Sequence, residues 1–127
     1  MPSWKKLIVS GSDAAIPSVS TAADFTIDAG GDIVLDADGT DIVLKDNGTE
    51  FGSFKRASSD FVIKSATSDK DILLKGSDGG ATITALQLDM SEGGNAQFLG
   101  NISGSQIEAS GDVIAFGSSD ERLKDNI

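Results

Sequence analysis

One short pattern of polar and apolar residues recurs between residues 24 and 75: an Asp, three mostly apolar residues, and then a charged residue. We call this pattern the repeat. Its five copies are Asp24-Phe25-Thr26-Ile27-Asp28, Asp32-Ile33-Val34-Leu35-Asp36, Asp41-Ile42-Val43-Leu44-Lys45, Asp60-Phe61-Val62-Ile63-Lys64 and Asp71-Ile72-Leu73-Leu74-Lys75. Successive copies start 8, 9, 19 and 11 residues apart, and the gaps are rich in residue types that favour turns. The sequence therefore predicts a series of short β-strands, one in each copy.

The apolar residues of each copy are expected to lie on both faces of the predicted sheet. Because side chains alternate along a strand, the first and third apolar positions share one face and the middle position points to the other. The middle residues are Thr26, Val34, Val43, Val62 and Leu73, so four of the five are apolar. A sheet with one face in water should carry polar residues there. We therefore expect both faces to be partly covered, and the chain has little to cover them with except further copies of itself.

The long interval between the third and fourth copies predicts a hairpin. It contains Asp46-Asn47-Gly48-Thr49, and an Asn-Gly pair accepts the positive φ angles of a two-residue turn. The return strand should cover residues 50–55, with Phe51 and Phe54 available for packing.

The pattern changes after residue 80. Thr82-Ile83-Thr84 predicts a further short strand, and the alternating apolar residues Leu86, Leu88 and Met90 follow it. A turn at residues 92–95 should lead into Gln97-Phe98-Leu99.

From Gly100 onward the apolar residues thin to single anchors. They are Ile102, Ile107 and Val113, five and six residues apart, with Gly104 and Gly111 between them. So sparse a pattern cannot build a core within one chain. Three chains wound about one axis can do so, because each supplies one apolar residue at each level and Gly allows close approach. We expect these three residues to form a trimer core.

Composition and charge exclude several classes of function. The 127 residues contain no Cys and no His, which removes disulfides, thiolate or imidazole metal ligands, and the Ser-His-Asp and Cys-His catalytic arrangements. The formal charge of −10 argues against nucleic acid or an anionic membrane as a partner. No apolar run approaches the roughly 20 residues of a membrane span, and Leu7-Ile8-Val9 is too short for a signal-peptide core.

The Asp-rich turn at residues 36–41 invites a calcium hypothesis that its spacing does not support. A helix-loop-helix calcium site needs Gly at its sixth place and a carboxylate at its twelfth. Those places hold Asp41 and Asn47. We therefore expect an ordinary turn here, no metal site and no cofactor.

The first residues allow two interpretations. Trp4, Lys5 and Lys6 precede the strand-like Leu7-Ile8-Val9, which is typical of an edge strand whose Trp packs on the next element. They also combine an aromatic residue with the only early basic pair of an acidic chain, which favours a docking peptide. Residues 12–23 are rich in Ser, Ala and Thr and are expected to form a linker or an irregular turn.

Several segments resemble structural proteins of marine tailed bacteriophages, above all their tail fibres. The segments that resemble the shaft repeats of these fibres are Asn47-Gly48-Thr49 with Phe51-Gly52, Phe61-Val62-Ile63-Lys64-Ser65, and Ile83-Thr84-Ala85-Leu86-Gln87-Leu88-Asp89-Met90-Ser91. Met1-Pro2-Ser3-Trp4-Lys5-Lys6, with Val9-Ser10-Gly11-Ser12, resembles their N-terminal segment. The most specific similarity is Gly111-Asp112-Val113-Ile114-Ala115-Phe116 followed by Ser118-Ser119-Asp120-Glu121-Arg122-Leu123-Lys124-Asp125-Asn126-Ile127. It resembles the junction with the intramolecular chaperone domain of endosialidase tailspikes.

In that family the chaperone trimerises the fibre, aligns its strands and then cuts itself off. The resemblance implies cleavage of the Ser119-Asp120 bond, with Ser119 as nucleophile and Lys124 as the activating amine, which must be desolvated to be neutral. The sequence departs from the family because it ends at Ile127 without the chaperone body, so we expect no catalysis from these residues alone. The other interpretation of this segment is a charged tail in which Ser118 and Glu121 cap a helix.

Together these observations predict an all-β, elongated, parallel homotrimeric fibre, similar to a β-prism or triple β-helix. Its parts would be a docking segment and linker (1–23), a shaft with a hairpin insertion (24–99), a thin stem (100–117) and the chaperone junction (118–127). We expect a non-enzymatic structural protein of the virion, made in the host cytoplasm, attached through its N-terminus to other virion proteins and presenting a part that binds a host receptor or glycan. Alternatives are a glycan-binding spike module and a self-assembling filament or capsid decoration protein.

Overall fold

The computed structural model describes residues 15–114, in which every regular element is a β-strand. The chain divides after Asp36 into two parts. Six strands lie in the second part: β1 (Asp41–Asp46), β2 (Thr49–Ala57), β3 (Asp60–Ser65), β4 (Ile72–Asp78), β5 (Ala81–Asp89) and β6 (Asn95–Phe98). The fold class is therefore all-β, as the sequence predicts.

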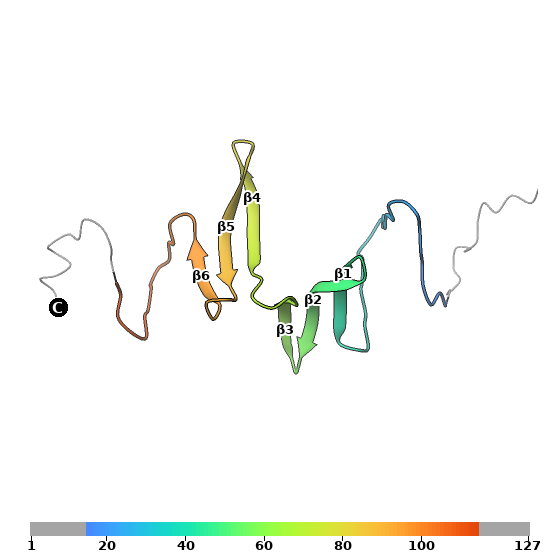
Figure 1. Ribbon diagram of the computed structural model, residues 1–127, viewed down its shortest axis with the longest axis horizontal. Coiled ribbons are helices and arrows are strands. Elements are labelled where there is room, and N and C mark those ends of the chain that lie inside the picture. Colours follow the sequence, from blue (N-terminus) through green and yellow to red (C-terminus); the bar gives the residue numbers. More distant parts are fainter. Residues whose placement is uncertain (1–14, 115–127) are drawn as a thin grey trace, which may run out of the picture. The chain divides into compact units, whose positions relative to one another are not determined.

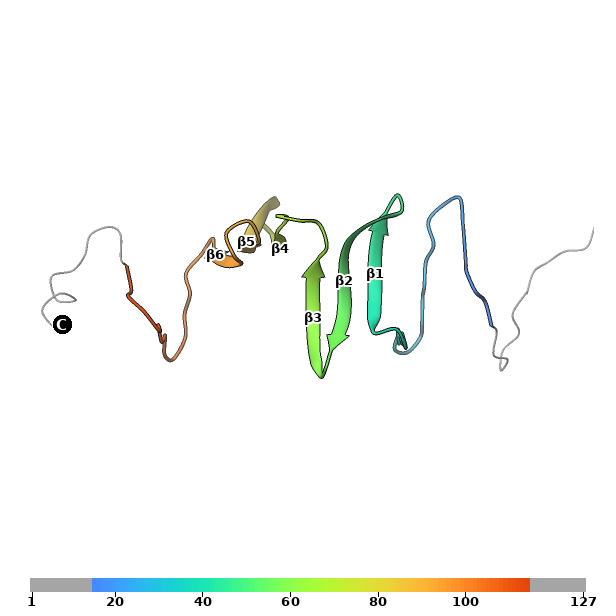
Figure 2. The same cartoon turned by 60° about the horizontal axis from the view of Figure 1, so that its bottom comes forward.

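The six strands form two antiparallel sheets. Sheet A has the order β1-β2-β3, and Figure 2 shows these strands side by side. Sheet B has the order β4-β5-β6, which is visible in Figure 1. Within each sheet, every strand pairs with its neighbour in sequence, because the loops between them are too short for a crossover.

Turn chemistry explains where the strands end. Asn47 and Gly48 have φ angles of 47° and 81°, the two-residue turn that the sequence predicts between β1 and β2. Gly79 and Gly80, at 58° and 89°, close the β4–β5 hairpin in the same way. The right-handed twist of the strands favours these mirror-image turns, and glycine adopts them without a Cβ clash.

Both sheets contain a β-bulge at the same step of the repeat. In sheet A, Leu44 faces Gly52 but Lys45 faces Glu50, so Phe51 is the extra residue. In sheet B, Leu74 faces Leu86 but Lys75 faces Thr84, so Ala85 is the extra residue. The third and fifth copies of the repeat thus build the same bulged hairpin.

Three of the five predicted repeat strands are confirmed. The third, fourth and fifth copies correspond to β1, β3 and β4. The return strand β2 extends beyond the predicted residues 50–55, and the two short pieces predicted near residues 82–90 are one continuous strand, β5.

The strands predicted for the first two copies are absent from the single chain. Residues 24–28 and 32–36 contain no strand, because neither has a hydrogen-bonded partner strand among residues 15–114. The described part of the predicted stem, residues 100–114, contains no strand either.

Candidate assembly surface

Sheet A carries its large apolar side chains on one face. Register and strand alternation place Ile42, Leu44, Phe54, Phe61 and Ile63 together on this face. The rings of Phe54 and Phe61 stack with their centroids 6.1 Å apart. Phe61 is nevertheless 74% exposed and Ile63 56% exposed. These side chains therefore lie together on one face of the sheet, and no other described part of the chain covers that face.

The other face of sheet A is mixed. It carries Asp41, Lys55 and Lys64 together with the middle repeat residues Val43 and Val62. The middle positions therefore share a face with charged groups, whereas the face with the large apolar side chains carries few charged residues, Arg56 among them.

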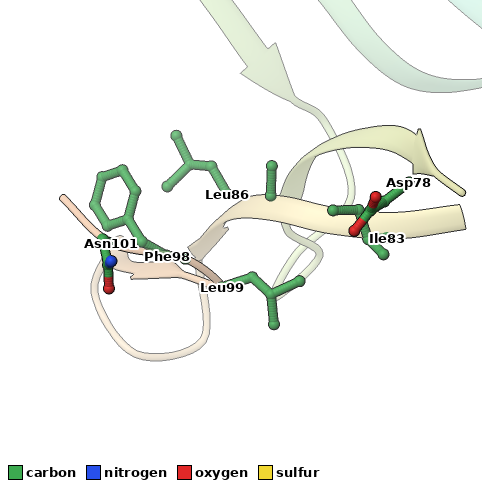
Figure 3. Close-up of a pocket in the computed structure, with 8 residues that line it drawn as sticks. Asp78, Ile83, Leu86, Phe98, Leu99 and Asn101 are labelled. Carbon is green, nitrogen blue, oxygen red and sulfur yellow. The ribbon is translucent and has the colours of Figure 1, made fainter. Parts of the chain in front are cut away.

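Sheet B has the same division. Ile72, Leu74, Leu86, Leu88 and Phe98 share one face by register. Figure 3 shows the side chains of Leu86 and Phe98 lying next to each other on neighbouring strands. Leu74 is 58% exposed and Phe98 is 49% exposed. The opposite face carries polar residues, among them Lys75, Thr82, Thr84 and Gln87, with Leu73 as the apolar exception.

A shallow groove lies at the β6 end of sheet B. Its apolar lining comes mainly from Ile83, Leu86, Phe98 and Leu99, and the polar groups of Asp78 and Asn101 stand beside it (Figure 3). The groove is continuous with the apolar face because it shares Leu86 and Phe98 with that face.

Within residues 15–114 no hydrophobic side chain is buried, and Ser53 is the one polar side chain that is. An antiparallel sheet normally packs one face against a core, and burial of apolar area is the main favourable term in folding. In the described chain both apolar faces lack such a cover. They are therefore the candidate functional surface of this protein.

The leading Asp of the repeat ties the edge strand of each sheet to its neighbour. In sheet A the Asp41 carboxylate lies 3.6 Å from Nζ of Lys55 on β2. In sheet B, Asp71 accepts a hydrogen bond of 2.7 Å from Nε2 of Gln87 on β5 and one of 3.1 Å from the backbone N–H of Met90. These contacts are consistent with the register from which the apolar faces follow.

The predicted trimer-core residues lie on irregular chain. Ile102, Ile107 and Val113 are 59%, 72% and 79% exposed, so the described part of the chain leaves them largely uncovered. Trp4, Lys5, Lys6, Ser119 and Lys124 lie outside the described residues.

The Asp-rich segment at residues 36–41 forms a turn closed by a 3.0 Å hydrogen bond from Thr40 N–H to the carbonyl of Ala37. Residues 15–114 contain no group of three or more acidic side chains arranged to hold a metal ion. The same residues include no helix of the length and apolarity needed to cross a bilayer.

Sequence reasoning placed the first and third apolar positions of each copy on one face, but it missed the apolar residues that the return strands β2 and β5 add to that face, and the bulges that shape it. The sequence does contain a signal for these faces, because Ile72 and Leu74, and likewise Leu86 and Leu88, are two residues apart and so share a face of a strand. The bulges have no comparable signal, because the extra residues Phe51 and Ala85 are ordinary strand residues.

Comparison with protein-family models, with curated proteins and with solved structures gave no match.

Proposed function

We propose that this chain is a structural subunit of a phage fibre or spike, in which three parallel copies associate through the apolar faces of both sheets. The shaft so formed carries or presents the part that binds the host receptor. One observation supports this function most directly: two sheets each present a continuous apolar face, and no hydrophobic side chain of residues 15–114 is buried.

Uncovered apolar faces favour association over a monomer in water. A sheet that is hydrophobic on one face is stabilised by burying that face against another element. Each apolar area that is removed from water contributes about 25 cal/mol per Å². A second and a third copy supply that cover without any other protein.

The support for a trimer and for a phage protein comes from the sequence. Ile102, Ile107 and Val113 provide one apolar residue per level, which suits three chains around a common axis. Three chains carry three times −10, or −30, charges, so the carboxylates belong on the solvent side. The resemblance to tail-fibre shafts and to the chaperone junction is the basis for proposing that the chain belongs to a virion. The segment with Trp4, Lys5 and Lys6 is the part proposed to join other virion proteins.

The role is non-enzymatic in the proposed assembly. Self-cleavage at Ser119-Asp120, assisted by Lys124, belongs to the proposal only for a longer chain that carries the chaperone body.

Sedimentation velocity and equilibrium of the purified chain at micromolar concentration test the proposed function. We expect a particle with the mass of three chains. A well-folded monomer with protected amides in β2 and β5 would overturn it, because such a monomer has no need of the apolar faces for association.

A further inference from the structure

The first two copies of the repeat behave differently from the others although their sequences are nearly the same. Asp32-Ile33-Val34-Leu35 is identical to Asp41-Ile42-Val43-Leu44. The second of these segments is strand β1 and pairs with β2 along its whole length. The first has no strand partner within the described range 15–114. The availability of a partner strand, and not the local sequence, therefore separates the two.

The unpaired copies leave their backbone and side chains uncovered. Residues 24–36 make no backbone hydrogen bond to another described residue, although backbone N–H and C=O groups are strong hydrogen-bonding groups. Phe25 is 61% exposed, Val34 81% and Leu35 62%. These two copies have the residue types of β-strands, but their side chains are as exposed as those of a loop.

The exposed apolar residues of 24–36 add to the apolar surface that assembly can cover. A second copy of the chain is the occupant that we consider, because it brings the same two unpaired copies of the repeat and therefore a segment of matching length and pattern.

We infer that residues 24–28 of one copy pair in parallel with residues 32–36 of the next copy, which turns both segments into strands on assembly. This inference rests on the proposed trimer. A pairing of the first copy of the repeat with the second is head-to-tail, and it closes into a ring when the third chain pairs with the first. The bend at Gly30 and Gly31 separates the two copies, so each can meet a different neighbour.

The proposed ladder sets the two copies in register by their Asp residues. Asp24 then lies beside Asp32, Thr26 beside Val34, and Ile27 beside Leu35. Residues 24–36 contain four Asp and no Lys or Arg, so like charges approach one another in the ladder and salt should strengthen it.

Disulfide trapping tests this pairing without interference, because the natural chain contains no Cys. The double variant Thr26→Cys/Val34→Cys places two thiols on neighbouring strands, where Cα atoms about 5 Å apart are within disulfide range. After mild oxidation of the full chain, we expect covalent trimers on a non-reducing denaturing gel. Each single variant should remain at the mass of one chain.

Two controls make the result specific. In Thr26→Cys/Ser53→Cys the second thiol lies on β2, which is paired on both sides within its own chain and whose Ser53 is buried, so covalent trimers should be absent. Ile27→Cys/Leu35→Cys reports on the adjacent position of the proposed register, whose side chains lie on the opposite face of the ladder, and gives an independent reading if the first pair disturbs assembly.

Other outcomes overturn the inference. An intrachain disulfide in the double variant would mean that the two copies pair within one chain, and covalent dimers of Val34→Cys alone would mean same-residue pairing. A chain that sediments as a trimer but gives no covalent trimer with either pair would refute the ladder and leave the proposed function intact. A chain that sediments as a monomer would refute the proposed function itself.

Discussion

Sheets A and B are built from the same repeat but are held by different chemistry. In both, the repeat of the first strand reads Asp, Ile, Val or Leu, Leu and Lys. Both sheets have a bulge between the Leu and the Lys, and the turns β1–β2 and β4–β5 each contain two residues of positive φ. The leading Asp41 of sheet A makes an ion pair with Lys55 between groups that are about one-third exposed. The leading Asp71 of sheet B instead accepts two hydrogen bonds from β5 and the turn that follows it.

This difference shows that the repeat determines the backbone path of each sheet but does not determine the partner of its leading Asp. The apolar positions and the turn residues set the backbone path in both sheets. The partner of the Asp is set by the neighbouring strand, Lys55 in one case and Gln87 in the other. The two sheets should therefore respond alike to changes on their apolar faces and differently to changes at the Asp.

The largest expected effect is that of a charge on either apolar face. Leu86→Asp in sheet B and Phe54→Asp in sheet A should each prevent association at micromolar concentration, because three carboxylates would have to leave water at a cost of several kcal/mol each. Sedimentation velocity should show monomers.

The matched control is Thr82→Asp, which places the same charge on the polar face of sheet B. It should leave the assembly unchanged. If only one of the two apolar-face variants dissociates the assembly, then the other sheet does not contribute its apolar face to the interface.

Next in size is the loss of the Asp71 acceptor. In Asp71→Asn one carboxylate oxygen becomes an NH₂ group, which cannot accept from Gln87 or Met90. We expect a loss of about 1–2 kcal/mol, seen as a lower melting temperature by circular dichroism at both low and high salt. Equal stability of Asp71→Asn and the natural chain would show that these hydrogen bonds do not hold sheet B.

A smaller effect should distinguish the turn of sheet B from its strand. Gly80 has a φ of 89°, so Gly80→Ala should cost about 1 kcal/mol through backbone strain. Gly76 lies in β4, and a methyl group added there would meet nothing within 4 Å. Gly76→Ala should be neutral or slightly stabilising in the same melting experiment, and equal losses at both positions would contradict the role of the positive φ.

The smallest expected effect is at the ion pair of sheet A. Asp41→Asn should lower stability by less than about 1 kcal/mol at low salt, as is usual for exposed pairs. The difference from the natural chain should shrink as salt screens the attraction. A loss that is independent of salt would mean that Asp41 acts through a contact other than Lys55.

The sequence predicts the local part of this fold well. Asn47-Gly48 specifies its turn through two positive φ angles, and copies three to five of the repeat become strands where a neighbouring segment can pair with them. These features depend on residues close together in the chain, so pattern and turn chemistry are sufficient.

Features that depend on a partner are harder to predict from sequence. Asp32-Ile33-Val34-Leu35 has the pattern of a strand, yet a strand also requires a second segment to receive its hydrogen bonds, and no pattern states whether that segment is in the same chain. The same limit applies to Ile107, whose exposure in one chain says nothing against burial among three. Position along the chain likewise did not disclose that Asp71 would meet Gln87, sixteen residues later.

The paired bulges also bear on how such a chain avoids folding errors. Near-identical repeats can slip past one another by two residues without turning any apolar side chain to the wrong face, so alternation alone does not exclude misaligned hairpins. Phe51 and Ala85 each break the alternation at one point of their hairpin. If a strand slips by two residues, the bulge no longer lies opposite its usual position on the partner strand. The side chains between the old and the new position of the bulge then point to the wrong face of the sheet. Each bulge thus acts as an alignment mark that a uniform run of repeats would lack.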